Sequence, residues 1–165
     1  MRVLMAHTYY RIRGGEDECY DAEVRLLQEM GLEVELYHDD NHRVPEMGKL
    51  AAARETIWSK NTYDGIRAKL RAKPADIVHV HNYLPLISPA AYHAAKSEGA
   101  AVVQTLHNYR LICPNGIFYR DGRVCEDCLG KTTAWPSVRH ACYRGSRAGS
   151  AVVAGMLTYH RLINT

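Results

Sequence analysis

The sequence predicts an α/β protein with a Rossmann-like, doubly wound parallel sheet that carries a cysteine-rich loop insertion. Two observations predict this fold. Four short runs of strand length alternate with longer segments whose apolar residues recur at three- and four-residue steps. The order is strand, helix, strand, helix, strand, helix, strand, and then a long loop and a final helix. Right-handed crossovers turn that order into a parallel sheet with helices on both faces.

The first two predicted strands enclose a glycine turn and a helix. The apolar run Arg2–His7 predicts a buried strand, and the alternation over Leu32–His38 predicts a second strand. Between them, Glu16–Met30 has an apolar stripe at helical spacing, and Gly31 ends the helix. We interpret Cys19 within this stripe as a small, buried apolar residue. The stripe consists of Cys19, Ala22, Leu26, Leu27 and Met30.

The middle of the chain continues the alternation of helices and strands. A polar connection over Asp39–Lys49 leads to two predicted helices, Leu50–Lys60 and Tyr63–Lys73. Pro74 closes the second helix because proline disfavours helical backbone at the residue before it. Residues Ala75–Asn82 then predict the third strand.

A helix, a fourth strand and a final helix complete the pattern. In Ser88–Gly99, Ser88 is a plausible N-cap and Pro89 suits the first helical position. The largely apolar run Ala100–His107 is typical of a parallel strand that is covered on both faces. After the cysteine-containing stretch, the apolar face of residues 146–165 predicts the final helix.

Length and composition bound the class of protein. With 165 residues, the chain fits a single domain over 1–165, with a cysteine-rich loop at 113–142 inside it. The net charge of +3 does not demand a nucleic acid partner. No apolar run is long enough to span a bilayer, and the N-terminus lacks the pattern of a signal peptide. We therefore expect a cytoplasmic protein, in which clustered thiols more often bind metal than form disulfides.

Polar, aromatic and basic side chains follow three of the predicted strands. The carboxyl ends of parallel strands meet at one edge of the sheet, and ligands bind beyond that edge in open α/β sheets. The set suits ligands that are rich in hydroxyl groups or carry phosphate. It consists of His7, Thr8, Tyr9, Tyr10, Arg11, Arg13, Gly14 and Gly15 after the first strand, His81, Asn82 and Tyr83 after the third, and His107, Asn108, Tyr109 and Arg110 after the fourth.

Each of these signals also has a structural explanation. Gly14 and Gly15 allow a ligand to approach the backbone at a helix start that can bind an anion, or they form only a tight turn. His107 is either a site residue, supported by the polar residues behind it, or a histidine satisfied at a sheet edge. His79 lies within the third strand and is interpreted as structural, whereas His81 is left open.

Four of the five cysteines lie between residues 113 and 142, in the spacing C-x11-C-x2-C-x13-C. The C-x2-C step is common in structural zinc sites, so we expect a zinc ion bound by all four thiolates that orders a long loop with few apolar residues. Disulfides and free thiols are the alternatives, and His140 is an alternative ligand. A closed site with four protein ligands is structural, because it leaves no position for a substrate. The four ligands are Cys113, Cys125, Cys128 and Cys142.

Three motifs together resemble a known family. The segments "GGED" at Gly14–Asp17, "DIVHVHN" at Asp76–Asn82 and "TLHNYRLICP" at Thr105–Pro114 are specific in combination. The chain resembles the N-terminal, acceptor-side domain of a GT-B glycosyltransferase of the retaining group called glycosyltransferase family four. The similarity extends over nearly the whole chain. It implies a parent enzyme that moves a sugar from a nucleotide-sugar donor to an acceptor hydroxyl.

The resemblance implies roles for individual residues. Gly14 and Gly15 match the glycine loop that approaches the donor diphosphate, and His107 matches the catalytic-site histidine that faces the transferring sugar. The acceptor side is implied for a further set of residues. They are Asn82, Tyr83, Asn108 and Arg110.

The resemblance covers only one of the two domains of such an enzyme. The donor-binding C-terminal domain, with its E-x7-E type motif, is missing, so the isolated domain is expected to have little or no transferase activity. The expected partners are that domain and a sugar or lipid-linked acceptor, with peripheral membrane association of the parent enzyme left open and no nucleic acid. The alternatives are a zinc-stabilised binding module and a stand-alone nucleotide-binding α/β protein.

Overall fold

A four-stranded parallel sheet forms the centre of the first part of the chain in the computed structural model, which describes residues 1–165. The strand order is β2-β1-β3-β4, and all three pairings are parallel. The α/β class with a parallel sheet is therefore confirmed, and it is consistent with a Rossmann-like fold. The strands are β1 (Arg2–Tyr9), β2 (Glu33–Asp40), β3 (Ile77–Val80) and β4 (Ala101–Gln104).

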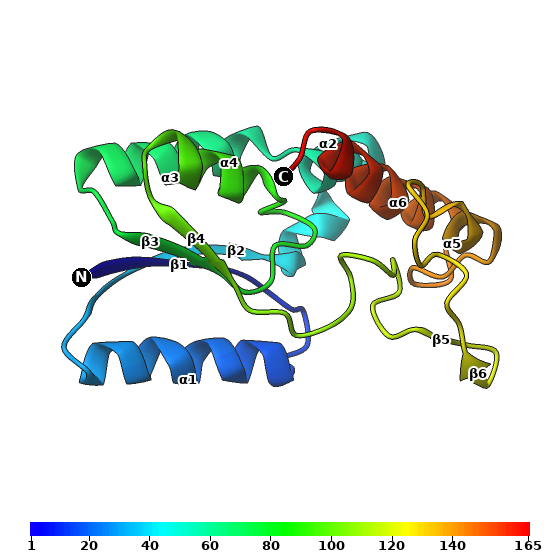
Figure 1. Ribbon diagram of the computed structural model, residues 1–165, viewed down its shortest axis with the longest axis horizontal. Coiled ribbons are helices and arrows are strands. Elements are labelled where there is room, and N and C mark those ends of the chain that lie inside the picture. Colours follow the sequence, from blue (N-terminus) through cyan, green and yellow to red (C-terminus); the bar gives the residue numbers. More distant parts are fainter. The chain divides into compact units, whose positions relative to one another are not determined.

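Helices cover both faces of this sheet. Figure 1 shows α1 on one face, with α3 and α4 on the other. This arrangement follows from the strand order, because the chain passes from β1 to one neighbour and then crosses β1 to reach β3. The helices are α1 (Gly15–Glu29), α2 (Lys49–Ile57), α3 (Lys60–Ala72) and α4 (Ala90–Ser97), and the 3-10 helix η1 (Asn41–Glu46) lies in the predicted polar connection.

The buried face of α1 differs from the predicted stripe. Tyr20 and Val24 pack against Val3 and Met5 of β1, whereas Cys19 is exposed. The interpretation of Cys19 as a buried apolar residue was therefore wrong. The buried face includes Tyr20, whose hydroxyl is hydrogen-bonded to His38. The predicted stripe omitted this residue because its hydroxyl is polar. Of the other stripe members, Leu27 packs partly against the core, and Ala22, Leu26 and Met30 are exposed.

The strand β4 is an edge strand with an exposed face. Val103 is 41% exposed, and Ala101 is exposed as well. The expectation that this strand is covered on both faces was therefore wrong. An apolar run of four residues cannot distinguish a central strand from an edge strand when one helix is too narrow to cover the whole sheet.

The two residues predicted to begin α4, Ser88 and Pro89, each lie one position before the predicted place in the helix. Pro89 is the N-cap residue of α4, and Ser88, which was predicted for that position, lies one residue earlier with φ 55°. The Ser88 hydroxyl still accepts the Ala90 N–H at 3.2 Å, and it also accepts the Ser59 N–H at 2.8 Å. The hydroxyl therefore joins the start of α4 to the segment before α3.

Residues 108–165 form a second compact unit, distinct from residues 1–107. The predicted final helix is present, and α5 packs against it. The cysteine stretch was predicted as a loop and contains three short elements, which propensity alone is too weak to specify. These three are β5 (Tyr119–Arg120), β6 (Arg123–Val124) and α5 (Trp135–Arg139), and the final helix is α6 (Arg147–Leu162). The expectation of a single domain over 1–165 stays a prediction. Neither unit contains a helix with the length and apolar character that crossing a bilayer requires.

Candidate functional site

The loops that follow β1 and β3 are joined at the carboxyl edge of the sheet. Thr8 N–H donates to the Asn82 carbonyl at 2.8 Å, and the Asn82 side-chain amide donates back to the Thr8 carbonyl at 2.8 Å. The Asn82 N–H also lies 3.3 Å from His7 Nδ1. These strands flank the point where the strand order reverses, which is the usual ligand crevice of such sheets.

A buried carboxylate fixes the other ring nitrogen of His7. His7 Nε2 lies 2.7 Å from Asp17 Oδ1, and both side chains are at most 1% exposed. Because His7 Nδ1 accepts the Asn82 N–H, the ring proton sits on Nε2 and is donated to Asp17. Asp17 also accepts the N–H groups of Tyr10 at 3.3 Å and Gly14 at 2.9 Å. Three donors thus converge on one carboxylate.

The predicted glycine turn opens α1, with Gly14 as N-cap and Gly15 as the first residue. Gly14 is extended at φ −134°, and a Cβ atom added to either glycine would meet no heavy atom within 4 Å. The Gly14 N–H is already bound by Asp17. The surrounding acids Glu16, Glu18 and Asp21 are bound by Tyr10, Arg13 and Tyr9. The role implied for the two glycines stays a prediction.

Histidine rings form a continuous group from β1 to the end of β4. The ring centroid of His7 lies 6.3 Å from that of His81, and His81 lies 4.6 Å from His79 and 5.2 Å from His107. His81 Nδ1 and His107 Nε2 are 3.0 Å apart. Tyr20 of α1 stacks on His7 with centroids 4.5 Å apart. The edge of the sheet therefore brings together residues that are up to a hundred positions apart in sequence.

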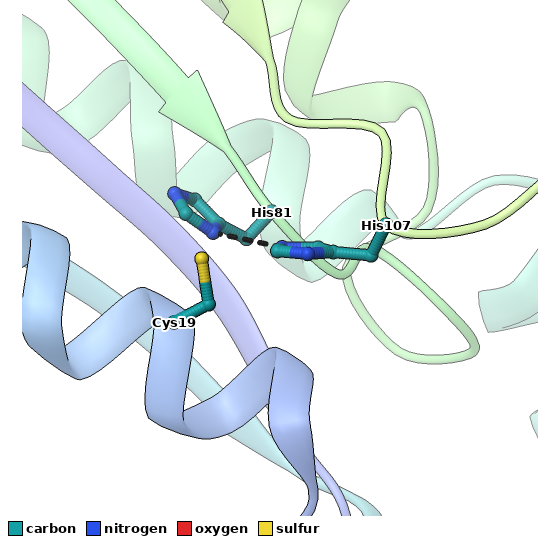
Figure 2. Close-up of side chains that lie close together, drawn as sticks. All are labelled: Cys19, His81 and His107. Atoms are coloured by element: carbon teal, nitrogen blue, oxygen red, sulfur yellow. Dashed lines mark hydrogen bonds between the residues drawn. The ribbon is translucent and has the colours of Figure 1, made fainter.

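Figure 2 shows how Cys19 of α1 meets this group. Its thiol points toward the paired rings of His81 and His107. The ligand atoms of these three residues all lie within 4.8 Å of one another. A second group with the same property shares His81 and contains Glu23 and His79. Glu23 lies one turn after Cys19 on the same helix face, so both side chains reach the same part of the sheet.

Burial favours the neutral form of three of these imidazoles, those of His7, His79 and His81. It lowers the pKa of His7 against the opposing effect of Asp17, and it lowers the pKa of His79 against the opposing effect of Glu23. Burial, with the neighbouring histidines acting in the same direction, lowers the pKa of His81 to about 3. Neutral imidazole retains a lone pair that can accept a proton or bind a metal.

The lowered pKa values predict acid sensitivity. The unfolded chain binds a proton at these histidines below its ordinary pKa near 6.5, but the folded chain does not until the lower folded pKa is reached. The unfolded state thus holds more protons, so stability is complete above pH 6.5 and falls as the pH drops. We expect a slope of about 1.4 kcal/mol per pH unit for each such histidine. Urea unfolding between pH 7 and pH 5 in the presence of a chelator measures the slope, and a flat or inverted profile would contradict the prediction.

Two predicted acceptor residues, Asn82 and Tyr83, lie at this edge but are buried. Asn82 is 7% exposed, and its side chain binds Thr8 and accepts the Leu84 N–H at 3.1 Å. Tyr83 is 5% exposed, and its ring centroid lies 6.1 Å from that of Tyr92. Both side chains therefore shape the loop after β3 from within.

The other two predicted acceptor residues, Asn108 and Arg110, belong to residues 108–165. Asn108 Oδ1 accepts the Arg110 N–H at 2.9 Å, and the Arg110 guanidinium donates to the Pro114 carbonyl at 2.8 Å and lies over the Tyr143 ring. Gly116, at φ 84°, leaves only 3.3 Å between an added Cβ and these two side chains. A larger residue would disrupt the turn that follows Cys113.

The four clustered cysteines line one cavity. Cys113, Cys125, Cys128 and Cys142 surround it together with Ser137 and Arg120, and none of them forms a disulfide. Burial raises the pKa of the Cys128 and Cys142 thiols. Turns position the thiols, since Gly116 N–H donates to the Cys113 carbonyl and Cys125 N–H donates to the Phe118 carbonyl, each at 2.8 Å. The expectation of a zinc ion bound by all four thiolates stays a prediction.

Comparison with protein-family models, with curated proteins and with solved structures gave no significant match.

Sequence reasoning missed the pairing of His7 with Asp17 and the meeting of Cys19 with two histidines. Signals for both were present. Asp17 is the third residue after the N-cap Gly14, where an acidic side chain reaches back to the cap. His79 and His81 alternate on one strand face, which predicts that both point toward the same helix. The sequence did not predict which face of which helix covers His79 and His81.

Proposed function

We propose that this chain is the acceptor-binding half of a glycosyltransferase that moves a sugar from a nucleotide-sugar donor to an acceptor hydroxyl. The observation that carries the proposal is the His81–His107 pair at the carboxyl edge of a parallel sheet, beside the joined loops after β1 and β3. Imidazole nitrogens can donate and accept hydrogen bonds, which suits sugar hydroxyls.

The proposal assigns His107 to the transferring sugar. His107 is only half-buried, and its Nε2 lies 3.0 Å from the buried His81, which holds the ring in place. Gly14 and Gly15 are assigned to the donor diphosphate through the helix start. Asn82 and Tyr83 are assigned to the acceptor side as residues that shape the loop, and Asn108 and Arg110 as residues that precede and orient the cysteine segment.

A structural zinc ion is part of this proposal. The four cysteines would hold it, and the ion would supply the folding energy that a small apolar cluster around Cys128, Ala134 and Ala154 does not. The cysteine segment is proposed as an insertion that follows the doubly wound sheet. The proposal also assigns the chain to the cytoplasm, where its five unpaired thiols would stay reduced.

The isolated chain is expected to bind saccharides weakly and to transfer nothing. In a transferase, charge on the leaving diphosphate is stabilised by dipoles and cations in a closed cleft. One half of a cleft cannot enclose a donor, so the parent enzyme requires a donor-binding domain as a partner. Its acceptor is a sugar or a lipid-linked sugar, for which peripheral membrane association is proposed.

The test is a saccharide array that is followed by NMR of the histidine rings. We expect the zinc-replete chain to bind a subset of saccharides and to show shifts of the His107 imidazole signals. His107→Ala should abolish the binding, whereas His42→Ala, an exposed histidine paired with Asp40, should retain it. A folded chain that binds no saccharide, or binds equally well without His107, would contradict the proposal.

The same protein tests the two alternatives. Tight binding of a nucleotide by the chain alone would favour a stand-alone nucleotide-binding protein. Binding to nucleic acid that weakens steeply with salt would favour a zinc-stabilised binding module. We expect neither, because half of a cleft cannot enclose a nucleotide and because a net charge of only +3 argues against nucleic acid.

A further inference from the structure

A thiol and two imidazoles from three separate elements meet at the carboxyl edge of the sheet. Cys19 comes from α1, His81 follows β3, and His107 lies beyond β4 (Figure 2). Their ligand atoms lie within 4.8 Å of one another. None of the three belongs to the four-cysteine cluster, so a ligand here would be a second one.

We propose that Cys19 Sγ, His81 Nδ1 and His107 Nε2 form a binding site for a divalent transition metal of borderline softness, with Zn²⁺ as the first candidate. Thiolate and imidazole are the ligands that zinc prefers. The two nitrogens are 3.0 Å apart. Two nitrogens bound to one tetrahedral zinc ion would be about 3.3 Å apart, so a small shift accommodates the ion.

The far side of His81 supplies an independent observation. The His81 side chain is fully buried, and its Nε2 makes no hydrogen bond of normal geometry. Glu23 Oε2 nevertheless lies 3.3 Å from that nitrogen. A metal on Nδ1 fixes the ring proton on Nε2, where it faces the carboxylate. Metal-binding histidines commonly have this arrangement, in which an outer carboxylate accepts the other ring proton.

The second group, Glu23 with His79 and His81, is a weaker candidate for a metal site. Both ring nitrogens of His79 already have partners, since Nε2 lies 2.8 Å from Thr105 Oγ1 and Nδ1 lies 3.2 Å from Glu23 Oε1. Metal binding there would break one of these contacts. Glu23 is better placed as the carboxylate that orients His79 and His81 together.

Three protein ligands leave one position of a tetrahedral ion open to an external ligand, unlike the closed four-cysteine cluster. The site also uses His107, the residue that the proposed function gives to the sugar. A bound metal would occupy Nε2, so only Nδ1 of this ring would remain for a sugar. The site itself does not rest on the proposed function, because its ligands and its test involve no sugar.

Alkylation of Cys19 by iodoacetamide is the test, because this thiol is exposed and its peptide can be followed by mass spectrometry. The full chain, with zinc only at the four cysteines, is treated with and without added Zn²⁺. We expect the added ion to slow alkylation of Cys19 about tenfold or more, since a metal-bound thiolate is a poor nucleophile. The four clustered cysteines serve as an internal reference in the same digest.

The variants decide which residues bind the metal. His107→Ala should abolish the protection of Cys19, and His42→Ala should retain it. Glu23→Gln should weaken zinc binding by about 10–100-fold without abolishing the protection. Should His81→Ala fail to fold, Cys19→Ser and His107→Ala, which change less buried residues, should each lower the zinc content by one equivalent. Protection that survives His107→Ala, or zinc binding that depends on Glu23 but leaves Cys19 reactive, would overturn the proposal.

Discussion

Replacing Asp17 with asparagine is expected to lower the free energy of unfolding by about 3–5 kcal/mol. The Asp17 side chain is fully buried and accepts N–H groups from His7, Tyr10 and Gly14. An asparagine amide presents one oxygen and one NH₂ group, so one of the three donors must face another donor. His7 cannot relieve the conflict by moving its proton, because Nδ1 already accepts the Asn82 N–H.

Urea unfolding followed by circular dichroism measures this loss. Glu18→Gln is the matched control, because it changes an exposed acid in the same helical turn and should alter stability by no more than about 0.5 kcal/mol. Similar unfolding curves for the Asp17 and Glu18 variants would show that the buried carboxylate has no such role.

Removal of the zinc ion that we propose for the four-cysteine cluster is expected to unfold residues 108–165 and to leave the sheet of residues 1–107 intact. The apolar cluster beside these cysteines is small, whereas structural zinc contributes about 10–16 kcal/mol of binding free energy to folding. In ¹H–¹⁵N NMR spectra, strong chelation should collapse the signals of residues 108–165 toward unfolded positions. The signals of Val3, Met5 and Val78 should keep their dispersion.

The Cys19→Ser variant is the suitable background for this measurement, because only the clustered cysteines then remain. Cys125→Ser with Cys128→Ser should reproduce the effect of the chelator. Less than about half an equivalent of zinc in the purified chain, together with unchanged spectra after chelation, would exclude the structural zinc ion.

Sequence patterns predicted where the strands and helices lie better than they predicted which side chains of each element are buried. Every strand and helix expected over residues 1–107 is present within a few residues of its predicted bounds, because periodicity and the punctuation by glycine and proline are local signals. The rotation of α1 was not predictable in this way. Tyr20 and the charged Asp17 lie on its buried face, and they do so because of hydrogen bonds to residues elsewhere in the fold.

For the candidate site, too, the sequence predicted which loops meet but not every side chain that lies there. The position of His107 beyond β4 followed from the end of an apolar run, and its approach to His81 followed from the parallel sheet. The thiol of Cys19 was assigned to the core because cysteine is usually buried. Only the three-dimensional packing showed that this thiol faces two imidazoles.

The reciprocal hydrogen bonds between Thr8 and Asn82 have a mechanical consequence. Because the turns after β1 and β3 are bonded through both main chain and side chain, we expect them to move together. A molecule that presses on either turn displaces both strands together. A displacement of one turn alone would have to break these hydrogen bonds, whereas the polar turn that precedes α1, where Ile12 is 87% exposed, lies outside the junction.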